Sequence, residues 1–322
     1  MSQLINDVKC RAVQAGVYAK LYKGHKPNEW KPWKEPGEHT LANGQICRND
    51  IQYSEKYPNS FFDVWYPDDQ RVLRPVVVYF HGGGFIFGDK TTGDPLADGG
   101  GSANKLIEIV KLGYAVINAN YALAPEYRFP VQIEQVDLLM RYLRDHANEL
   151  MLDMNRVCLS GGSAGADLTE MYGVCVCNPE YAQKLGISPV MTKEQLKVLL
   201  IDEAALDANV FEANMFAMLG CWTGAEKDAK EGVMKLINAK EFIRDSFIPS
   251  WVNASNEGCE KGGFFSTEAI ALKEKLDAIH VDCDLVYFPG AGLPHGYMDQ
   301  FDRNPQGKEA LNRMLAFLQK YM

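Results

Sequence analysis

Short apolar runs alternate with amphipathic stretches along most of this chain. Residues 62–66 alternate with period two and residues 75–80 form a continuous apolar run, and both patterns are typical of strands. Beyond them, the pattern predicts helices at 101–112, 131–146, 164–177, 267–278 and 307–321, and strands at 115–120, 157–160, 196–201, 248–253 and 281–288. Helices that alternate with strands in this way predict an α/β fold with a mostly parallel central sheet and helices on both faces.

Two segments depart from this alternation. Residues 1–45 predict one helix, at 4–21, followed by an irregular stretch rich in Lys, Pro and Trp, and we expect them to lie outside the sheet as an N-terminal helical cap segment. Residues 204–244 contain amphipathic helical pieces and form a candidate second cap segment. The sequence therefore predicts one main domain, residues 46–322, with a small helical cap.

Composition and charge narrow the function classes. The chain has 322 residues, of which 47% are hydrophobic and 23% charged, as in ordinary globular proteins. Its 33 basic and 42 acidic residues give a net charge of −9, which argues against nucleic acid as a partner because phosphate binding needs a basic face. The oligomeric state stays open, with a homodimer among the options.

Charges and cysteines along the chain bear on the compartment in which the protein is located. The N-terminal residues carry charges and no long apolar run, and no window is apolar enough for a membrane span, so we expect a cytoplasmic protein. The eight cysteines show no metal-site spacing, and we expect free, buried thiols. No dinucleotide fingerprint or metal-ligand cluster is present, and the sequence predicts no cofactor.

The segment Gly161-Gly162-Ser163-Ala164-Gly165 is the strongest candidate for chemistry. It follows a predicted strand and precedes a predicted helix, the context in which a serine is exposed on a sharp turn. Small residues two positions to either side are needed there, because a Cβ would collide with the turn. Ser163 is therefore a candidate nucleophile.

A glycine-rich segment supplies candidate oxyanion donors. His81-Gly82-Gly83-Gly84 directly follows the buried strand at 75–80, where backbone N–H groups can approach a substrate closely. A phosphate-binding loop is the rival interpretation, but the lysine followed by serine or threonine that such a loop requires is missing.

A serine nucleophile needs a base, and a third group must hold that base in place. Of the six histidines, His280 and His295 follow Ser163, in agreement with the chain order serine, acid, histidine. His280 lies at a helix-to-strand turn. His295 lies in a Gly- and Pro-rich loop after the last strand, from which a side chain can reach the serine, and we favour it as the base.

These motifs together resemble the hormone-sensitive-lipase family of α/β-hydrolase esterases. The resemblance spans about residues 50–320 and includes the segment 121–126 as well as His295-Gly296-Tyr297. It implies an α/β-hydrolase fold, with Ser163 as nucleophile, His295 as base, and the N–H groups of Gly83, Gly84 and Ala164 as the oxyanion hole. His81, Gly82 and Glu126 are expected behind that hole.

The third triad member is where the chain departs from this family. The usual aspartate follows the strand at 248–253, where alignment puts Glu257 or Gly258 in its place. Of these two only Glu257 can hold an imidazole tautomer, so Glu257 is the predicted acid. Asp282 and Asp284, within the last strand, are weaker substitutes.

Hydrolysis of short-chain carboxylic esters through an acyl-enzyme intermediate is the predicted function, with a small-molecule ester as substrate. Two alternatives stay open. The missing aspartate keeps alive a catalytically weak or silent ligand-binding protein on the same scaffold. An amide or formamide hydrolase would share the nucleophile and the oxyanion segment.

Overall fold

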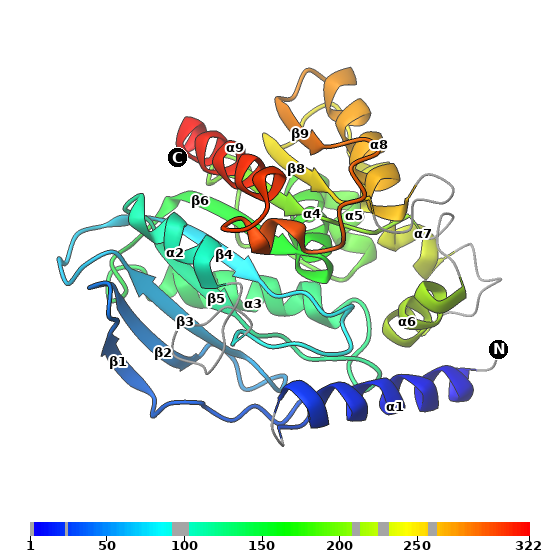
Figure 1. Ribbon diagram of the computed structural model, residues 1–322, viewed down its shortest axis with the longest axis horizontal. Coiled ribbons are helices and arrows are strands. Elements are labelled where there is room, and N and C mark those ends of the chain that lie inside the picture. The colour runs from blue at the N-terminus through cyan, green and yellow to red at the C-terminus, as the bar shows by residue number, and fades with distance from the viewer. Residues whose placement is uncertain (1–2, 23–24, 92–102, 208–212, 225–231, 257–262) are drawn as a thin grey trace.

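The computed structural model describes residues 3–22, 25–91, 103–207, 213–224, 232–256 and 263–322. Within these ranges the chain forms one nine-stranded sheet with the order β1-β2-β3-β5-β4-β6-β7-β8-β9 (Figure 1). The strands are β1 (Gly37–Thr40), β2 (Ile46–Gln52), β3 (Phe61–Tyr66), β4 (Arg74–Phe80), β5 (Ala115–Ala119), β6 (Leu152–Gly162), β7 (Leu196–Asp202), β8 (Ser250–Ala254) and β9 (Cys283–Tyr287).

The sheet is antiparallel at one edge and parallel through the rest. β1, β2, β3 and β5 pair antiparallel with their neighbours, whereas β5, β4, β6, β7, β8 and β9 run parallel. In the centre, Val78 of β4 lies between Ile117 of β5 and Leu159 of β6. Parallel strands end at the same edge of a sheet, so the loops after β4, β6 and β7 come together there.

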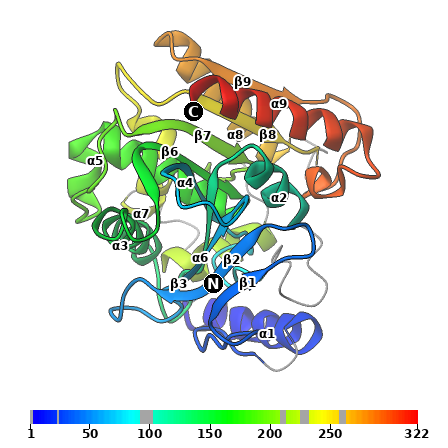
Figure 2. The same ribbon diagram turned by 90° about the vertical axis from the view of Figure 1, so that its left-hand side faces the viewer.

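The helices cover both faces of the sheet (Figure 2). They are α1 (Gln3–Leu21), α2 (Ala103–Lys111), α3 (Val131–Asp145), α4 (Ala164–Cys177), α5 (Pro179–Lys184), α6 (Ala213–Thr223), α7 (Val233–Ile237), α8 (Phe264–Ala278) and α9 (Pro305–Tyr321), with 3-10 turns η2 (Ala239–Phe242) and η4 (Tyr297–Gln300). One core layer packs α3, α4 and α8 against the sheet, and a second layer packs α2 and α9 against its other face.

Strand β4 shows why the sheet lies between two layers. Val76 and Val78 belong to the first core layer, whereas Val77 and Tyr79 belong to the second. Successive side chains of a strand point to opposite faces, so a strand that is covered on both sides is apolar at every position. Burial on both faces therefore explains the uninterrupted apolar run in the sequence. The predicted α/β architecture is confirmed.

Two departures from the predicted elements occur near the ends of the chain. Residues 37–40 form β1, which pairs with β2 at the sheet edge, so the expectation that residues 1–45 lie outside the sheet was wrong for these four. The C-terminal helix begins two residues earlier than predicted. Its start is fixed by Asn304, whose side chain accepts hydrogen bonds from the N–H groups of Gln306 and Gly307, and by Pro305 at the first helical position.

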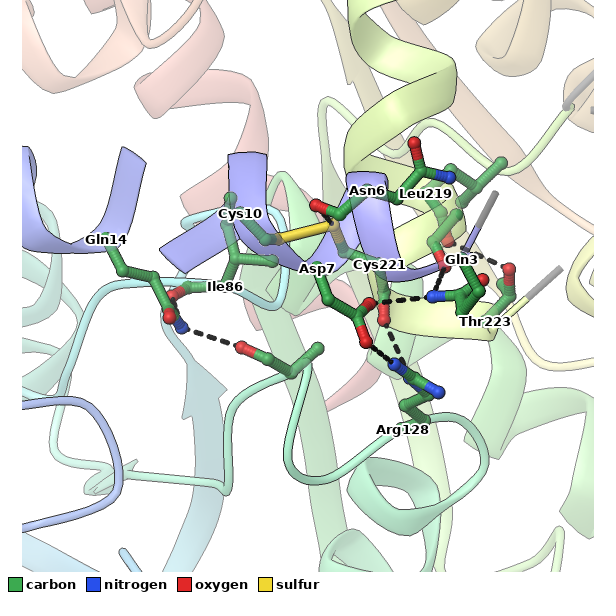
Figure 3. Close-up of a disulfide and its surroundings, with 12 residues drawn as sticks. Gln3, Asn6, Asp7, Cys10, Gln14, Ile86, Arg128, Leu219, Cys221 and Thr223 are labelled. Atoms are coloured by element: carbon green, nitrogen blue, oxygen red, sulfur yellow. Dashed lines mark hydrogen bonds and ion pairs between the residues drawn. A yellow bond between two sulfur atoms is a disulfide. The ribbon is translucent and has the colours of Figure 1, made fainter. Parts of the chain in front are cut away.

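The predicted N-terminal segment and the predicted second cap segment lie side by side. Helix α1 packs along α6, and a disulfide between Cys10 and Cys221 joins them, with their Cα atoms 6.5 Å apart (Figure 3). The expectation of free thiols was therefore wrong for these two cysteines, whereas Cys158, Cys175, Cys177 and Cys283 form no disulfide, and Cys259 lies outside the described residues. Sequence spacing could not reveal the pair, because 211 positions separate its members.

Polar contacts reinforce the attachment of α1. Asp7 accepts a hydrogen bond from the Arg128 guanidinium at 2.6 Å. Gln14, which is buried, donates from Nε2 to the backbone oxygens of Ile86 and Ala124, both at 2.7 Å. Ile86 follows the glycine segment 82–84, so α1 contacts the loop that the sequence predicts to carry the oxyanion donors.

No helix in the described part of the chain is long and apolar enough to cross a membrane.

Replacement of Cys221 by serine tests the disulfide. A bond that closes so long a loop restricts the unfolded chain, and its loss is expected to lower the free energy of unfolding by about 2–4 kcal/mol, as measured by urea unfolding. Cys177→Ser, at a free cysteine, is the matched control and should change that energy by less than about 1 kcal/mol. The unmutated protein is denatured without reduction and treated with a thiol reagent. If all eight cysteines react, the pairing is contradicted.

Candidate active site

Ser163 lies on the sharp turn between β6 and α4. Its backbone has φ 53° and ψ −122°, a conformation that L-residues rarely adopt. The turn leaves no room for side chains on either side. A Cβ at Gly161 would come within 2.2 Å of the Gly165 carbonyl, and a Cβ at Gly165 within 2.0 Å of the Phe80 oxygen. The glycines that predicted the turn are therefore a steric requirement.

The N–H groups of Ser163 and Ala164 are the backbone donors at this turn. The N–H of Ser163 itself is engaged, since it donates to the Asp202 oxygen at 2.8 Å. Ala164 is the first residue of α4, and the N–H groups of a first helical turn have no acceptor within their own helix. The Ala164 N–H is therefore in position to serve an anion that forms at Ser163.

The glycine segment after β4 approaches the same serine. A Cβ at Gly82 would lie 3.3 Å from the Ser163 Cβ, so the two chain segments touch. Gly83, at φ 111°, lines the cavity that contains Ser163. Gly84, at φ 59°, packs instead against Met218 of α6, whose Sδ would be 2.4 Å from a Cβ at that position. The roles of Gly83, Gly84 and Ala164 as oxyanion donors remain predictions.

His81 supports this segment from behind. Its ring is buried, stacks on Tyr121 with centroids 4.2 Å apart, and has Nδ1 2.7 Å from the Gly82 oxygen. Burial lowers the pKa of His81 to about 4, so the ring is neutral at physiological pH. A neutral ring fixed by stacking holds the chain in place without adding charge beside the serine.

Glu126 contacts a different part of the molecule. Its carboxylate forms an ion pair with Arg11 of α1 near the surface, at a groove separate from the Ser163 cavity. Any support for the oxyanion segment from Glu126 is therefore indirect, through α1 and its residue Gln14.

His295 is held by a carboxylate that the sequence analysis did not select. Its Nδ1 lies 2.9 Å from Oε2 of Glu203, and its ring stacks on Phe265 with centroids 4.4 Å apart. The Glu203 side chain is only 3% exposed, whereas that of His295 is 37% exposed. A carboxylate at Nδ1 fixes the tautomer in which Nε2 carries the lone pair that can accept a proton.

Glu203 is positioned by the end of β7. It directly follows Asp202, the last residue of the strand, and has φ 62°. Its N–H donates to the Asn253 oxygen of β8 at 2.9 Å, and its Oε2 also accepts the Gly296 N–H at 2.7 Å. The same carboxylate oxygen thus holds both the histidine ring and the backbone beside it. Like Ser163, Glu203 keeps an unfavourable backbone conformation at the site.

The other candidate residues have different surroundings. Glu257 lies outside the described residues and stays a prediction. Asp282 and Asp284 form ion pairs with Lys320 and Arg313 of α9, and His280 is exposed at the turn after α8. A signal for Glu203 exists in the sequence, because two carboxylates directly follow the apolar run 198–201. Residues at the carboxyl end of a parallel strand face the ligand-binding edge of the sheet.

Ser163, His295 and Glu203 line one cavity of about 210 Å³. Tyr22, which follows α1, contributes to its wall, in agreement with a cap formed by the N-terminal segment. In the described part of the chain, no three His, Cys, Asp or Glu side chains are grouped so that they could hold a metal ion. A serine, an imidazole and a carboxylate are thus brought together at this cavity.

The family comparison agrees with this geometry. Residues 62–252 match the model of the BD-FAE family, which is a hormone-sensitive-lipase-like esterase family. The chain belongs to the BD-FAE family. The matched region contains the oxyanion segment, the Ser163 turn and Glu203. The resemblance inferred from the motifs is therefore confirmed.

Similar proteins of known name support the same assignment. The BD-FAE chain is 34% identical to carboxylesterase NlhH of Mycobacterium tuberculosis over 272 residues, which cover 80% of this chain and 77% of the relative. It is 32% identical to the acetyl esterase of Salmonella schwarzengrund over 101 residues, 31% and 28% of the two chains. Among solved structures, esterase B from Lactobacillus rhamnosis superposes with a TM-score of 0.75 at 20% identity, covering 100% and 96% of the chains. The last likeness shows the shared fold.

Glu203→Gln tests the contact with His295. Glutamine keeps the size of the side chain but loses the charge that holds Nδ1–H and stabilises the imidazolium, so kcat for an ester should fall by about 10³–10⁴-fold. Glu194→Gln, an exposed position beyond the opposite end of β7, is the matched control and should retain native activity. A native rate in Glu203→Gln together with a large loss in Glu257→Gln would reverse the assignment.

Asp167, one helical turn after Ser163, predicts a pH dependence of stability. Burial, with a contribution from Glu268, raises the pKa of Asp167 to about 8. A carboxyl group whose pKa is raised in the folded state contributes to the free energy of unfolding. This contribution is fully present below about pH 4 and is lost as the pH rises through about 8. Asp167→Asn removes the proton exchange and can still accept the Ala205 N–H.

The variant should therefore gain stability relative to the native protein between pH 5 and 8, by up to about 1.4 kcal/mol per pH unit in urea unfolding. Parallel stability curves for the two proteins across this range would contradict the raised pKa.

Proposed function

We propose that this BD-FAE protein is a serine esterase that hydrolyses small carboxylic esters, with Ser163 as nucleophile, His295 as general base and Glu203 as the acid that orients it. The observation that carries the proposal is the 2.9 Å contact between His295 Nδ1 and Glu203 Oε2 in the cavity that also contains Ser163. Serine hydrolases need this combination of a serine, a base and an orienting carboxylate.

The reaction follows from these roles. His295 Nε2 takes the Ser163 proton as Oγ attacks the ester carbonyl, and the N–H groups of Gly83, Gly84 and Ala164 receive the negative charge that develops on the carbonyl oxygen. His295 then gives the proton to the leaving alcohol, and an acyl group remains on Ser163. A water molecule, deprotonated by the same imidazole, releases the acid and restores the serine.

The substrate is proposed to be an ester with a short acyl chain. A cavity of about 210 Å³ is small for a ligand site, and the name of the acetyl esterase from Salmonella schwarzengrund points to the same class. The Cys10–Cys221 bond ties the cap helices together and limits how far they can separate. The alternative of a silent ligand-binding protein depended on a missing acid, and the contact between the Glu203 carboxylate and His295 argues against it.

Location and assembly are separate questions. A cytoplasmic location remains a prediction from the sequence, and the Cys10–Cys221 bond argues against it, because disulfides are rare in reducing compartments. A homodimer remains an untested option.

Hydrolysis of p-nitrophenyl esters from acetate to decanoate tests the proposal. The native protein should turn over acetate and butyrate fastest and lose activity toward octanoate and decanoate. Ser163→Ala should lower kcat by at least about 10⁴-fold while circular dichroism stays native, because no other group can form the acyl intermediate. Ester turnover that survives in this variant would rule out Ser163 as the nucleophile.

A further inference from the structure

A polar cluster lies in the wall of the Ser163 cavity and has no part in the mechanism above. It consists of Lys105 from α2, Tyr79 at the end of β4, Asp202 at the end of β7, and Asp299 in η4, and all four line the cavity. Lys105 Nζ is 3.1 Å from Asp202 Oδ2 and 2.9 Å from Asp299 Oδ1. Elements from four distant parts of the sequence therefore meet at one ammonium group.

The cluster directly adjoins the nucleophile. A Cβ at Gly162, the residue before Ser163, would lie 3.3 Å from Tyr79 Oη and 3.8 Å from Lys105 Nζ. On the other side, Asp299 follows His295 by four residues, and its Oδ2 would lie 3.7 Å from a Cβ at Gly296. The cluster thus extends from the backbone of the serine to the loop that carries the histidine.

This position corresponds to the leaving alcohol. His295 must deliver its proton to the leaving oxygen, so the alcohol part of a bound ester has to lie on the histidine side of Ser163. Asp299 belongs to the turn that begins beside His295. The polar groups therefore face the alcohol rather than the acyl part of the substrate.

The hydrogen bonds within the cluster leave one acceptor and one donor for a ligand. Asp202 is engaged through Lys105 and through Asn253, whose Nδ2 donates to Oδ1 at 2.8 Å. The Asp299 side chain is 35% exposed, and its ion pair with Lys105 uses Oδ1 and leaves Oδ2 toward the cavity. The Tyr79 hydroxyl has no acceptor in the described part of the chain. Asp299 Oδ2 can accept a hydrogen bond and the Tyr79 O–H can donate one.

Protonation states agree with this division. Burial alone would lower the pKa of Lys105, but Asp299, Tyr79 and Asp202 outweigh it and raise that pKa well above its usual value. Burial also raises the pKa of Tyr79, so its hydroxyl keeps its proton. Lys105 acts as a positioning residue that holds the Asp299 carboxylate at the cavity wall.

Charge selects among the alcohols that could bind there. The two carboxylates of the cluster and the nearby Glu203 outnumber the Lys105 ammonium, so they repel an anionic group. An ammonium group carries hydrogen-bond donors only and cannot accept from the Tyr79 hydroxyl. A neutral hydroxyl group can both donate to Asp299 and accept from Tyr79.

On the basis of the proposed esterase function, we infer that Tyr79 and Asp299 form a subsite for a neutral leaving alcohol that carries at least one further hydroxyl group. The preferred substrates are then monoesters of diols and polyols, and simple alkyl esters are poorer substrates. An alkyl group in this place would leave the Asp299 and Tyr79 groups without partners after water is displaced.

A matched pair of acetates tests this subsite. 2-Hydroxyethyl acetate and n-propyl acetate have the same number of heavy atoms and differ by a hydroxyl in place of a methyl group. The ratio of their kcat/KM values, divided by the ratio of their alkaline hydrolysis rates, removes the difference in intrinsic reactivity. The native protein should favour the hydroxyl substrate by about 10- to 100-fold on this scale, as expected for hydrogen bonds that involve a charged group.

Two variants assign the preference to the cluster. Asp299→Ala and Tyr79→Phe should each bring the normalised ratio close to one, whereas Asp302→Asn, an exposed carboxylate outside the cavity, should keep the native ratio. Tyr79→Phe removes only a hydroxyl, so it remains informative if Asp299→Ala fails to fold.

The outcomes separate the two proposals. A native protein that hydrolyses both acetates with a normalised ratio near one, or variants that keep the native ratio, would overturn the subsite and leave the esterase intact. A native protein that hydrolyses no ester would overturn the esterase function and, with it, the subsite.

Discussion

The contact between two backbone segments that have no room for side chains determines the geometry of this site. The turn around Ser163 closes on itself at Gly161 and against Phe80 at Gly165, where an added Cβ would lie about 2 Å from backbone atoms. The oxyanion segment touches the same turn at Gly82. Parallel pairing of β4 with β6 brings these segments to one edge of the sheet, and the glycines let them approach closely enough to share a substrate.

Two carboxylates at the end of β7, Asp202 and Glu203, hold the other polar groups of the site in place. Glu203 directly follows the last residue of β7, and its carboxylate contacts both the His295 ring and the Gly296 N–H. Asp202, its neighbour, accepts the Ser163 N–H on its backbone oxygen and the Lys105 ammonium on its side chain. Two consecutive carboxylates at the end of one strand thus connect Ser163, His295 and the polar wall of the cavity.

The sequence predicted what local patterns encode. Apolar runs buried on both faces identified β4 to β8, and the steric demand for glycine identified the Ser163 turn and the glycine segment after β4. β1 escaped prediction because an exposed edge strand of four residues carries no apolar signature. The Cys10–Cys221 pair and the Glu203–His295 contact depend on packing between distant segments. The family resemblance pointed to the position after β8, whereas Glu203, which contacts His295, follows β7.

The predicted cap helices α1 and α6 both contact the chain that directly follows the glycine segment. Trp222 of α6 stacks on Phe85 with ring centroids 3.7 Å apart, and Gln14 of α1 donates to the Ile86 oxygen. Phe85 and Ile86 directly follow the glycines of the oxyanion segment. The disulfide between α1 and α6 therefore joins two helices that both contact Phe85 or Ile86. The glycine segment is thus held in position from outside the sheet, and the predicted oxyanion donors need this rigidity to stabilise a developing charge without reorganisation.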